Sequence, residues 1–206
     1  LFKVFNPRTT SMRRAKIIRN TSETQVSVNI CLDGSGKSTI ETGIGFFDHM
    51  LDLFTRHGLF DIEISARGDL QVDFHHTVED VGICLGDALR KALGDKHGIR
   101  RYGFSSTPMD EVLATVSLDL SGRSFLSLDN PVEDRTAGNF PLDLVRVFFQ
   151  AFSDRSAMTL HASVQSAQNP HHAAEGLFKA LARALRQAVE VDPRVLGAPS
   201  TKGVLE

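Results

Sequence analysis

Two short motifs in the sequence carry side chains that commonly bind metal ions. Residues 73–80 read DFHHTVED and place Glu79 three residues after the pair His75 and His76, and residues 169–176 read NPHHAAEG with the same spacing. On a helix, side chains three and four positions apart share a face, so the glutamate can approach both histidines. Adjacent imidazoles diverge by about 100° around the helix axis, so one helix could supply ligands to two metals.

The second motif supplies His171, His172 and Glu175, and both motifs begin a longer internal repeat. Residues 75–92 and 171–188 align with an offset of 96 and no gap, and eight of the eighteen positions are identical. A single HHxxE motif is more often a pair of exposed or hydrogen-bonded histidines at a helix start, but two matched copies favour metal ligands. Imidazole with carboxylate suits manganese, iron, zinc or nickel, and ligand type alone does not choose among them.

The elements that must position these motifs repeat as well. Apolar residues recur every three or four positions in each repeat, which predicts helices, and each is preceded by a strand-like run and an earlier amphipathic helix. The predicted bounds are 45–58, 75–92, 141–152 and 171–188 for helices and 22–34, 58–68, 111–123 and 156–165 for strands. This order predicts two α+β half-domains of about 95 residues, each with helices on one face of a sheet. We expect the first half at 1–95, the second at 96–192 and a tail at 193–206.

Composition argues against several classes of protein. The chain of 206 residues is long enough for one large or two small cores, and its formal net charge of −2 argues against a nucleic-acid partner. No run of about 18 apolar residues occurs, so we expect no membrane span, and the N-terminal residues do not resemble a signal peptide. Cys31 and Cys84 lie in apolar segments and are expected to be buried free thiols, so we expect a cytoplasmic protein.

Other polar residues could bind an anion or assist the histidine pairs. The segments GIRRYG, SGR and APSTKGVL bring arginines, hydroxyls and one lysine, which can bind phosphate, although the glycine spacing of a P-loop is missing. These residues are Arg100, Arg101, Arg123, Ser200, Thr201 and Lys202. His49 lies on an amphipathic helix and could be structural or a ligand, whereas His57 lies at the end of that helix, where a cation suits the dipole.

With these residues in place, the chain resembles the imidazoleglycerol-phosphate dehydratases of histidine biosynthesis. The matching strings cover about residues 13–205 and include TGIGFFDHMLD, RHGLFDIEISARGDL, both HHxxE segments, GIRRYG, DLSGR and PSTKGVL. The resemblance implies a lyase that converts D-erythro-imidazoleglycerol phosphate to imidazole-acetol phosphate, with two Mn²⁺ ions per site holding the substrate imidazolate. It also implies duplicated four-stranded sheets backed by helices, and a homo-oligomer of trimers assembled into a 24-chain shell with sites between subunits.

The resemblance further implies roles for individual residues. The implied metal ligands are His49, His75, His76, Glu79, His171, His172 and Glu175. The implied phosphate-binding residues are Arg101, Arg123, Ser200 and Lys202, and those around the substrate are Glu23, His49, His57, Asp110 and Lys179. With Glu175, the residues Glu23, His57, Asp110 and Lys179 form the implied catalytic set, in which a carboxylate acts as general base.

Two positions depart from the family pattern. Phe74 stands where the family usually has an acid before the first histidine pair, and Val147 stands where it usually has a histidine or glutamate ligand. Valine cannot coordinate, so one metal would keep a water, bind more weakly or take another ligand. A metal-assembled homologue that has lost turnover and a binuclear metal hydrolase are the alternatives. The phosphate-binding residues and both HHxxE motifs favour the dehydratase.

Overall fold

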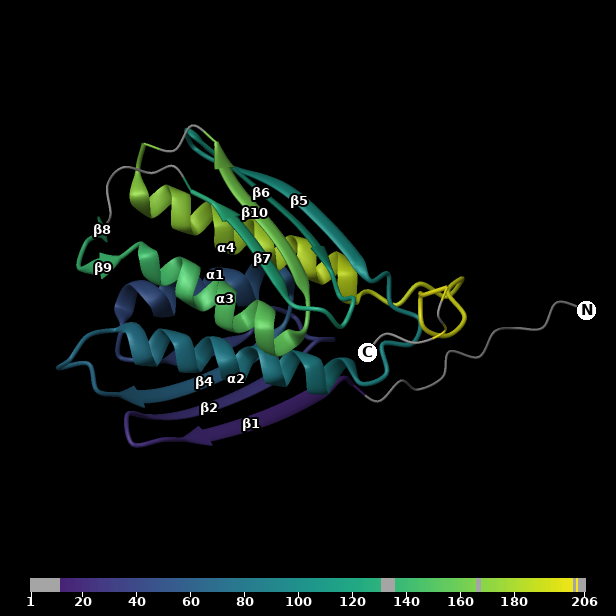
Figure 1. Cartoon of the computed structure of the whole chain (residues 1–206), viewed down its shortest axis with the longest axis horizontal. Coiled ribbons are helices and arrows are strands. Elements are labelled where there is room, and N and C mark those ends of the chain that lie inside the picture. Colours follow the sequence, from purple (N-terminus) through teal and green to yellow (C-terminus); the bar gives the residue numbers. More distant parts are fainter. Residues whose placement is uncertain (1–11, 131–135, 166–167, 202, 204–206) are drawn as a thin grey trace, which may run out of the picture.

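The structure is a computed structural model that describes residues 12–130, 136–165, 168–201 and 203. The first half of the chain forms a four-stranded sheet and two helices (Figure 1). Its elements are β1 (Arg14–Asn20), β2 (Thr24–Cys31), β3 (Ser38–Glu41), α1 (Gly45–Gly58), β4 (Asp61–Gly68) and α2 (His75–Leu93). The second half repeats this order and adds a small hairpin before its first helix. Its elements are β5 (Tyr102–Met109), β6 (Val112–Asp119), β7 (Phe125–Asp129), β8 (Thr136–Ala137), β9 (Phe140–Pro141), α3 (Asp143–Ser156), β10 (Thr159–Gln165) and α4 (Pro170–Val189).

The two large sheets have the same strand order and register. Their orders are β1-β2-β4-β3 and β5-β6-β10-β7, and in each sheet only the third and fourth strands of this order pair in parallel. Arg14 faces Cys31 across the first pair, and Tyr102 faces Asp119, each 88 residues later, across the equivalent pair. The predicted fold, α+β with a duplicated four-stranded sheet backed by helices, is confirmed.

Helices α1 and α3 also correspond, because both have 14 residues and they begin 98 residues apart. Each ends at a residue in the left-handed region, Leu59 with φ 55° and Ala157 with φ 52°. In both cases the backbone N–H of this residue hydrogen-bonds to carbonyls of the last turn, which satisfies groups that a helix end leaves open. The two helices therefore end at equivalent positions of the repeat, so their turns correspond one to one.

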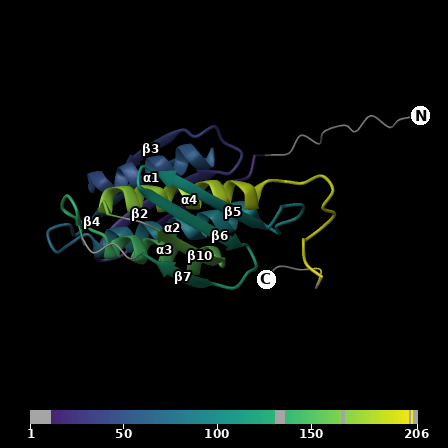
Figure 2. The ribbon, with the colours of Figure 1, turned by 90° about the horizontal axis from the view of Figure 1, so that it is seen from above.

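The four helices lie between the two sheets, so each sheet buries one face (Figure 1). Alternate residues of β2 and β4 are buried, and the same alternation occurs in β6 and β10. Seen from above, the strands β5 and β6 cross in front of α4 (Figure 2). Gly103 permits close approach of α4 to β5, since a Cβ there would lie 1.9 Å from the carbonyl oxygen of Ala184. A single apolar core therefore joins both halves.

Other sequence-based expectations have mixed outcomes. Cys31 and Cys84 are free and buried, as predicted, and burial raises the pKa of the Cys84 thiol to about 12. Within the described ranges, the helices are all too short or too polar to cross a membrane. The predicted helix at 141–152 begins and ends later, at Asp143–Ser156. The domain boundaries near residues 95 and 192 stay predictions.

The crossing of α2 and α3 depends on glycine at position 86. A Cβ on Gly86 would lie 2.7 Å from Arg155 Cβ and 2.8 Å from the carbonyl oxygen of Phe152. Alanine favours a helix by about 1 kcal/mol over glycine, but overpacking of a core costs about 1–3 kcal/mol. We expect Gly86→Ala to lower the free energy of unfolding, measured by urea denaturation. Gly45→Ala is the control, since a Cβ there meets nothing within 4 Å, and equal stability of both variants would contradict the prediction.

Candidate metal centre

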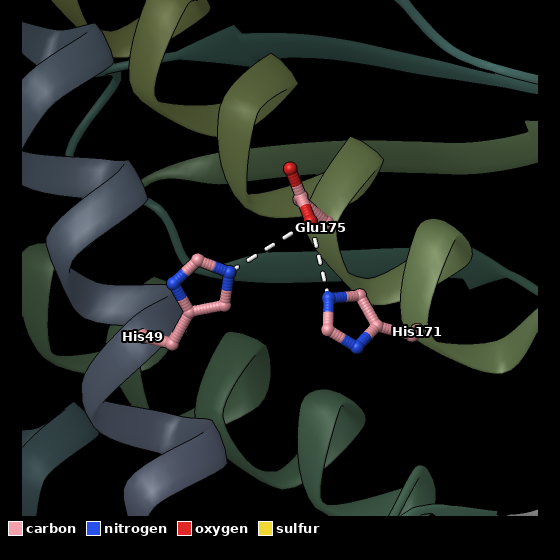
Figure 3. Close-up of side chains that lie close together, drawn as sticks. All are labelled: His49, His171 and Glu175. Atoms are coloured by element: carbon pink, nitrogen blue, oxygen red, sulfur yellow. Dashed lines mark hydrogen bonds and ion pairs between the residues drawn. The ribbon is translucent and has the colours of Figure 1, made fainter.

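Three side chains of types that can bind a metal converge where α1 packs against α4. His49 comes from α1, and His171 and Glu175 come from the first turns of α4 (Figure 3). Glu175 Oε2 lies 3.2 Å from His171 Nε2 and 3.8 Å from His49 Nε2. One ligand atom from each residue falls within 4.8 Å of the others. Two imidazoles and a carboxylate at this spacing fit a divalent transition metal.

The start of α4 presents this face because its N-terminus is well capped. The Asn169 side chain accepts a hydrogen bond from the backbone N–H of His171 at 2.9 Å, and Pro170 occupies the first helical turn. At the start of α2, the Asp73 carboxylate accepts a hydrogen bond from the backbone N–H of His75 at 2.7 Å. Both histidine pairs are therefore held in the first turn of a helix, where the polar side chains can leave the core.

Glu175 is buried and is kept ionised by its neighbours. Burial alone would raise the pKa of Glu175, but the hydrogen bond and the positive charge of Lys179, together with the nearby imidazoles of His49 and His171, lower it below its usual value. Burial lowers the pKa of His57, and the ammonium of Lys179 lowers it further. The structure thus brings five of the predicted site residues onto α1 and α4, namely His49, His57, His171, Glu175 and Lys179, and the charge of Lys179 acts on both Glu175 and His57.

The second histidine of this pair points to a different carboxylate group. His172 Nδ1 lies 2.9 Å from Glu111 Oε2, and its Nε2 lies 3.8 Å from Asp110 Oδ2. The Glu111 carboxylate raises the pKa of His172, and this contact lowers the pKa of Glu111. Asp110, Glu111 and His172 form a second group that could hold a metal ion. His171 and His172 therefore diverge, as the helical geometry predicts.

The first HHxxE motif divides in a similar way. His76 Nδ1 lies 3.0 Å from Asp69 Oδ2 and 3.9 Å from Glu23 Oε2, and the Asp69 carboxylate raises the pKa of His76. His75 and Glu79 instead line a pocket of 370 Å³ between α2 and α3. Glu79 therefore lines the same pocket as His75, whereas His76 contacts the carboxylates of Asp69 and Glu23, which lie outside the helix. The approach of Glu79 to both histidines stays a prediction.

Of the predicted phosphate-binding residues, Arg101, Arg123 and Ser200 lie at the other end of the fold. Arg101 forms a bidentate pair with Asp119, at 2.6 and 3.0 Å, and donates a third hydrogen bond to the carbonyl oxygen of Pro199 at 2.9 Å. This contact joins Arg101 to the C-terminal segment directly before Ser200. Arg123 is exposed in the loop after β6. Lys202 lies outside the described residues.

Two site residues were not identified from the sequence, namely Glu111 and Asp69. A signal for Glu111 was present, because Glu23 and Glu111 directly precede the equivalent strands β2 and β6 and lie 88 residues apart, as do the paired residues of the sheets. Asp69 offered no comparable signal, because it lies in the loop before α2. The contact of Asp69 with His76 depends on the conformation of that loop, which the sequence does not indicate.

The chain is similar to known proteins over most of its length. It matches the family model described as imidazoleglycerol-phosphate dehydratase over residues 42–185. The imidazoleglycerol-phosphate dehydratase of Desulforamulus reducens is 55% identical over 193 residues, which cover 94% of this chain and 98% of the relative. The same enzyme of Streptococcus mutans is 55% identical over 194 residues, which cover 94% of this chain and 100% of the relative.

Solved structures of this family share the fold. The imidazoleglycerol-phosphate dehydratase of Staphylococcus aureus has a TM-score of 0.79 at 37% identity, covering 87% of this chain and 99% of the other. The enzyme of Pyrococcus furiosus, solved in complex with (S)-C348, has a TM-score of 0.80 at 36% identity, covering 92% of this chain and 100% of the other. The chain therefore belongs to the imidazoleglycerol-phosphate dehydratase family of histidine biosynthesis and is a hydro-lyase.

Proposed function

We propose that this chain converts D-erythro-imidazoleglycerol phosphate to imidazole-acetol phosphate at a site that holds two divalent metal ions, which we take to be Mn²⁺. The cluster of His49, His171 and Glu175 is the observation that carries this proposal, because its donors suit such an ion. His75, His76, Glu79 and His172 complete the proposed ligand set. When bound, the ions stabilise negative charge on the substrate's imidazole ring as Lewis acids.

The protein side chains must also remove a proton from carbon, which requires a carboxylate that is free to accept it. Glu111 is a weak candidate, since it already accepts a hydrogen bond from the backbone N–H of Asn169 at 3.0 Å and contacts His172. Glu23 is more exposed, with 54% of its side chain accessible, and its nearest histidine nitrogen is 3.9 Å away. We therefore assign the general base to Glu23.

Three further residues support this chemistry. Lys179 holds the Glu175 carboxylate in its ionised form, which a metal ligand requires. Burial lowers the pKa of His57 and so favours its neutral form, which is the form that can accept a proton. Asp110 lies beside His172 and is exposed, so it can reach a bound substrate. These contacts support the catalytic set of Glu23, His57, Asp110, Glu175 and Lys179.

The phosphate group is assigned to Arg101, Arg123, Ser200 and Lys202. Arg101 uses three of the five N–H groups of its guanidinium within the chain, so two remain for a phosphate. However, Arg101 directly precedes β5 and Asp110 directly follows it, and eight extended residues span about 27 Å. Figure 1 likewise shows both HHxxE helices starting at one end of the molecule and the C-terminal tail at the other.

A glycerol phosphate bearing one imidazole is far shorter than this separation. One chain therefore cannot bind the imidazole with its histidine pairs and the phosphate with its own Arg101. We propose that each site is formed between subunits of a homo-oligomer, built of trimers assembled into a 24-chain shell. The free, buried cysteines support a reducing compartment such as the cytoplasm.

Metal removal should abolish turnover, and metal restoration should recover it. We expect acid to act in the same way, because the ligands must lose protons to bind metal. The pKa of His76 and of His172 is raised by Asp69 and Glu111, so protons compete with metal at a higher pH than for ordinary imidazoles. Metal content measured by mass spectrometry should fall as the pH is lowered from about 8 to about 5.5. Full turnover in a verified metal-free sample would contradict the proposal, and metal binding without turnover would favour the inactive homologue.

Metal should also control assembly if ligands come from more than one chain. Chelation should then convert the protein to a smaller species, measured by light scattering. Restoring Mn²⁺ should return the original mass, whereas Mg²⁺, which prefers oxygen ligands, should not. An unchanged mass after complete metal removal would show that assembly does not depend on the metal.

Mixing two inactive variants should restore activity if sites form between subunits. We expect Glu175→Gln to remove a metal ligand and Arg123→Ala to weaken phosphate binding. After joint reassembly, about a quarter of the sites would combine an intact metal half with an intact phosphate half. As a control, Glu175→Gln mixed with His171→Ala should stay inactive, because both lie on the same helix start. Absence of recovery in the first mixture, with mixed assembly verified by mass, would contradict intersubunit sites.

A further inference from the structure

The two metal-binding halves of the chain have diverged at one ligand position. Helices α1 and α3 correspond with an offset of 98 residues, which matches His49 with Val147. Helices α2 and α4 carry HHxxE motifs with an offset of 96, which matches His171 and Glu175 with His75 and Glu79. The counterpart of the cluster in Figure 3 is therefore two donors and a valine.

The surroundings of Val147 agree with this correspondence. Val147, His75 and Glu79 line one pocket between α2 and α3, as expected for the equivalent of the α1–α4 cluster. Val147 is only partly buried and packs at the edge of the core, whereas the following Phe148 and Phe149 are fully buried. Its methyl groups therefore occupy the place at the pocket where His49 presents an imidazole in the other half.

A second difference points in the same direction. Lys179 hydrogen-bonds to Glu175 one turn along α4, and the corresponding residue of α2 is Ile83, which also lines the pocket. Glu175 is thereby held in place by an ammonium, while Glu79 has an aliphatic neighbour at that position. Support of this kind orients a ligand, and its loss typically costs about 10–100-fold in metal affinity.

We propose that the two halves bind divalent metal with unequal affinity. The half with His49, His171 and Glu175 takes the first ion, and the half with His75 and Glu79 holds the second ion more weakly. Because a missing direct ligand should cost at least as much as a missing supporting residue, we expect a difference of at least about 10-fold. This inference rests on the proposed metal-dependent function and adds the order in which its two sites fill.

The test is a titration of the metal-free, full-length protein with Mn²⁺, in which the free ion is followed by its electron paramagnetic resonance signal. The unmodified protein should show two classes of site per chain. Val147→His should tighten the weaker class by about 10-fold or more, in line with one added ligand. Val147→Leu, which changes size without adding a donor, should leave both classes unchanged.

The reverse substitution, His49→Val, keeps the inference testable if Val147→His folds poorly. His49→Val gives both halves two donors and a valine, so it should abolish the tight class and leave the weaker one. Two sites of equal Mn²⁺ affinity in the unmodified protein would overturn only the proposed difference in affinity. Absence of Mn²⁺ binding would overturn both this inference and the proposed function. Lower thermal stability of Val147→His, with unchanged Mn²⁺ affinity, would overturn the assignment of Val147 to the ligand position.

Discussion

Burial of the Glu175 carboxylate is the constraint around which the cluster of His49, His171 and Glu175 is organised. An ionised carboxylate removed from water costs on the order of several kcal/mol unless it has charged or hydrogen-bonding partners. Lys179 satisfies one oxygen from the next turn of the same helix, and the other oxygen faces the two imidazoles. One of these imidazoles, that of His49, belongs to the other half of the chain. The packing of α1 against α4 therefore creates the cluster and satisfies the buried charge at the same time.

The scaffold of the two halves is more alike than their polar groups. Strand order and register are the same because each sheet must present one apolar face to the same layer of helices. Helix side chains that are not fully buried are released from that requirement, since they lie at the edge of the core. His49 and Val147, or Lys179 and Ile83, can therefore differ without any change of topology. Divergence is concentrated where packing is least demanding.

The length of the secondary-structure elements also shapes the chemistry. Helices and strands run the length of the molecule, so both histidine pairs lie at one end and Arg101 with the C-terminal segment lies at the other. The bidentate pair with Asp119 holds Arg101 at the end of the molecule opposite to the histidine pairs. Under the proposed function, two chains must meet before one substrate can contact both groups. Assembly then becomes a requirement of catalysis rather than an addition to it.

Much of the fold could be predicted from the sequence because a helix or strand with one buried face repeats apolar residues at a regular spacing. The helices and the four strands that were predicted, β2, β4, β6 and β10, are those with a regularly buried face, and these strands occupy the centres of the two sheets. The strands of the two large sheets that were missed, β1, β3, β5 and β7, are all edge strands, whose side chains are less strictly divided between core and water. The short strands β8 and β9 were also missed.

The two HHxxE motifs were likewise determined by the sequence alone, because their donors lie within one turn of helix. Their partners were decided by the tertiary structure. His49 reaches His171 across 122 residues, and Asp69 reaches His76 through a loop. No local pattern contains these contacts, because they arise from the way the helices pack between the sheets.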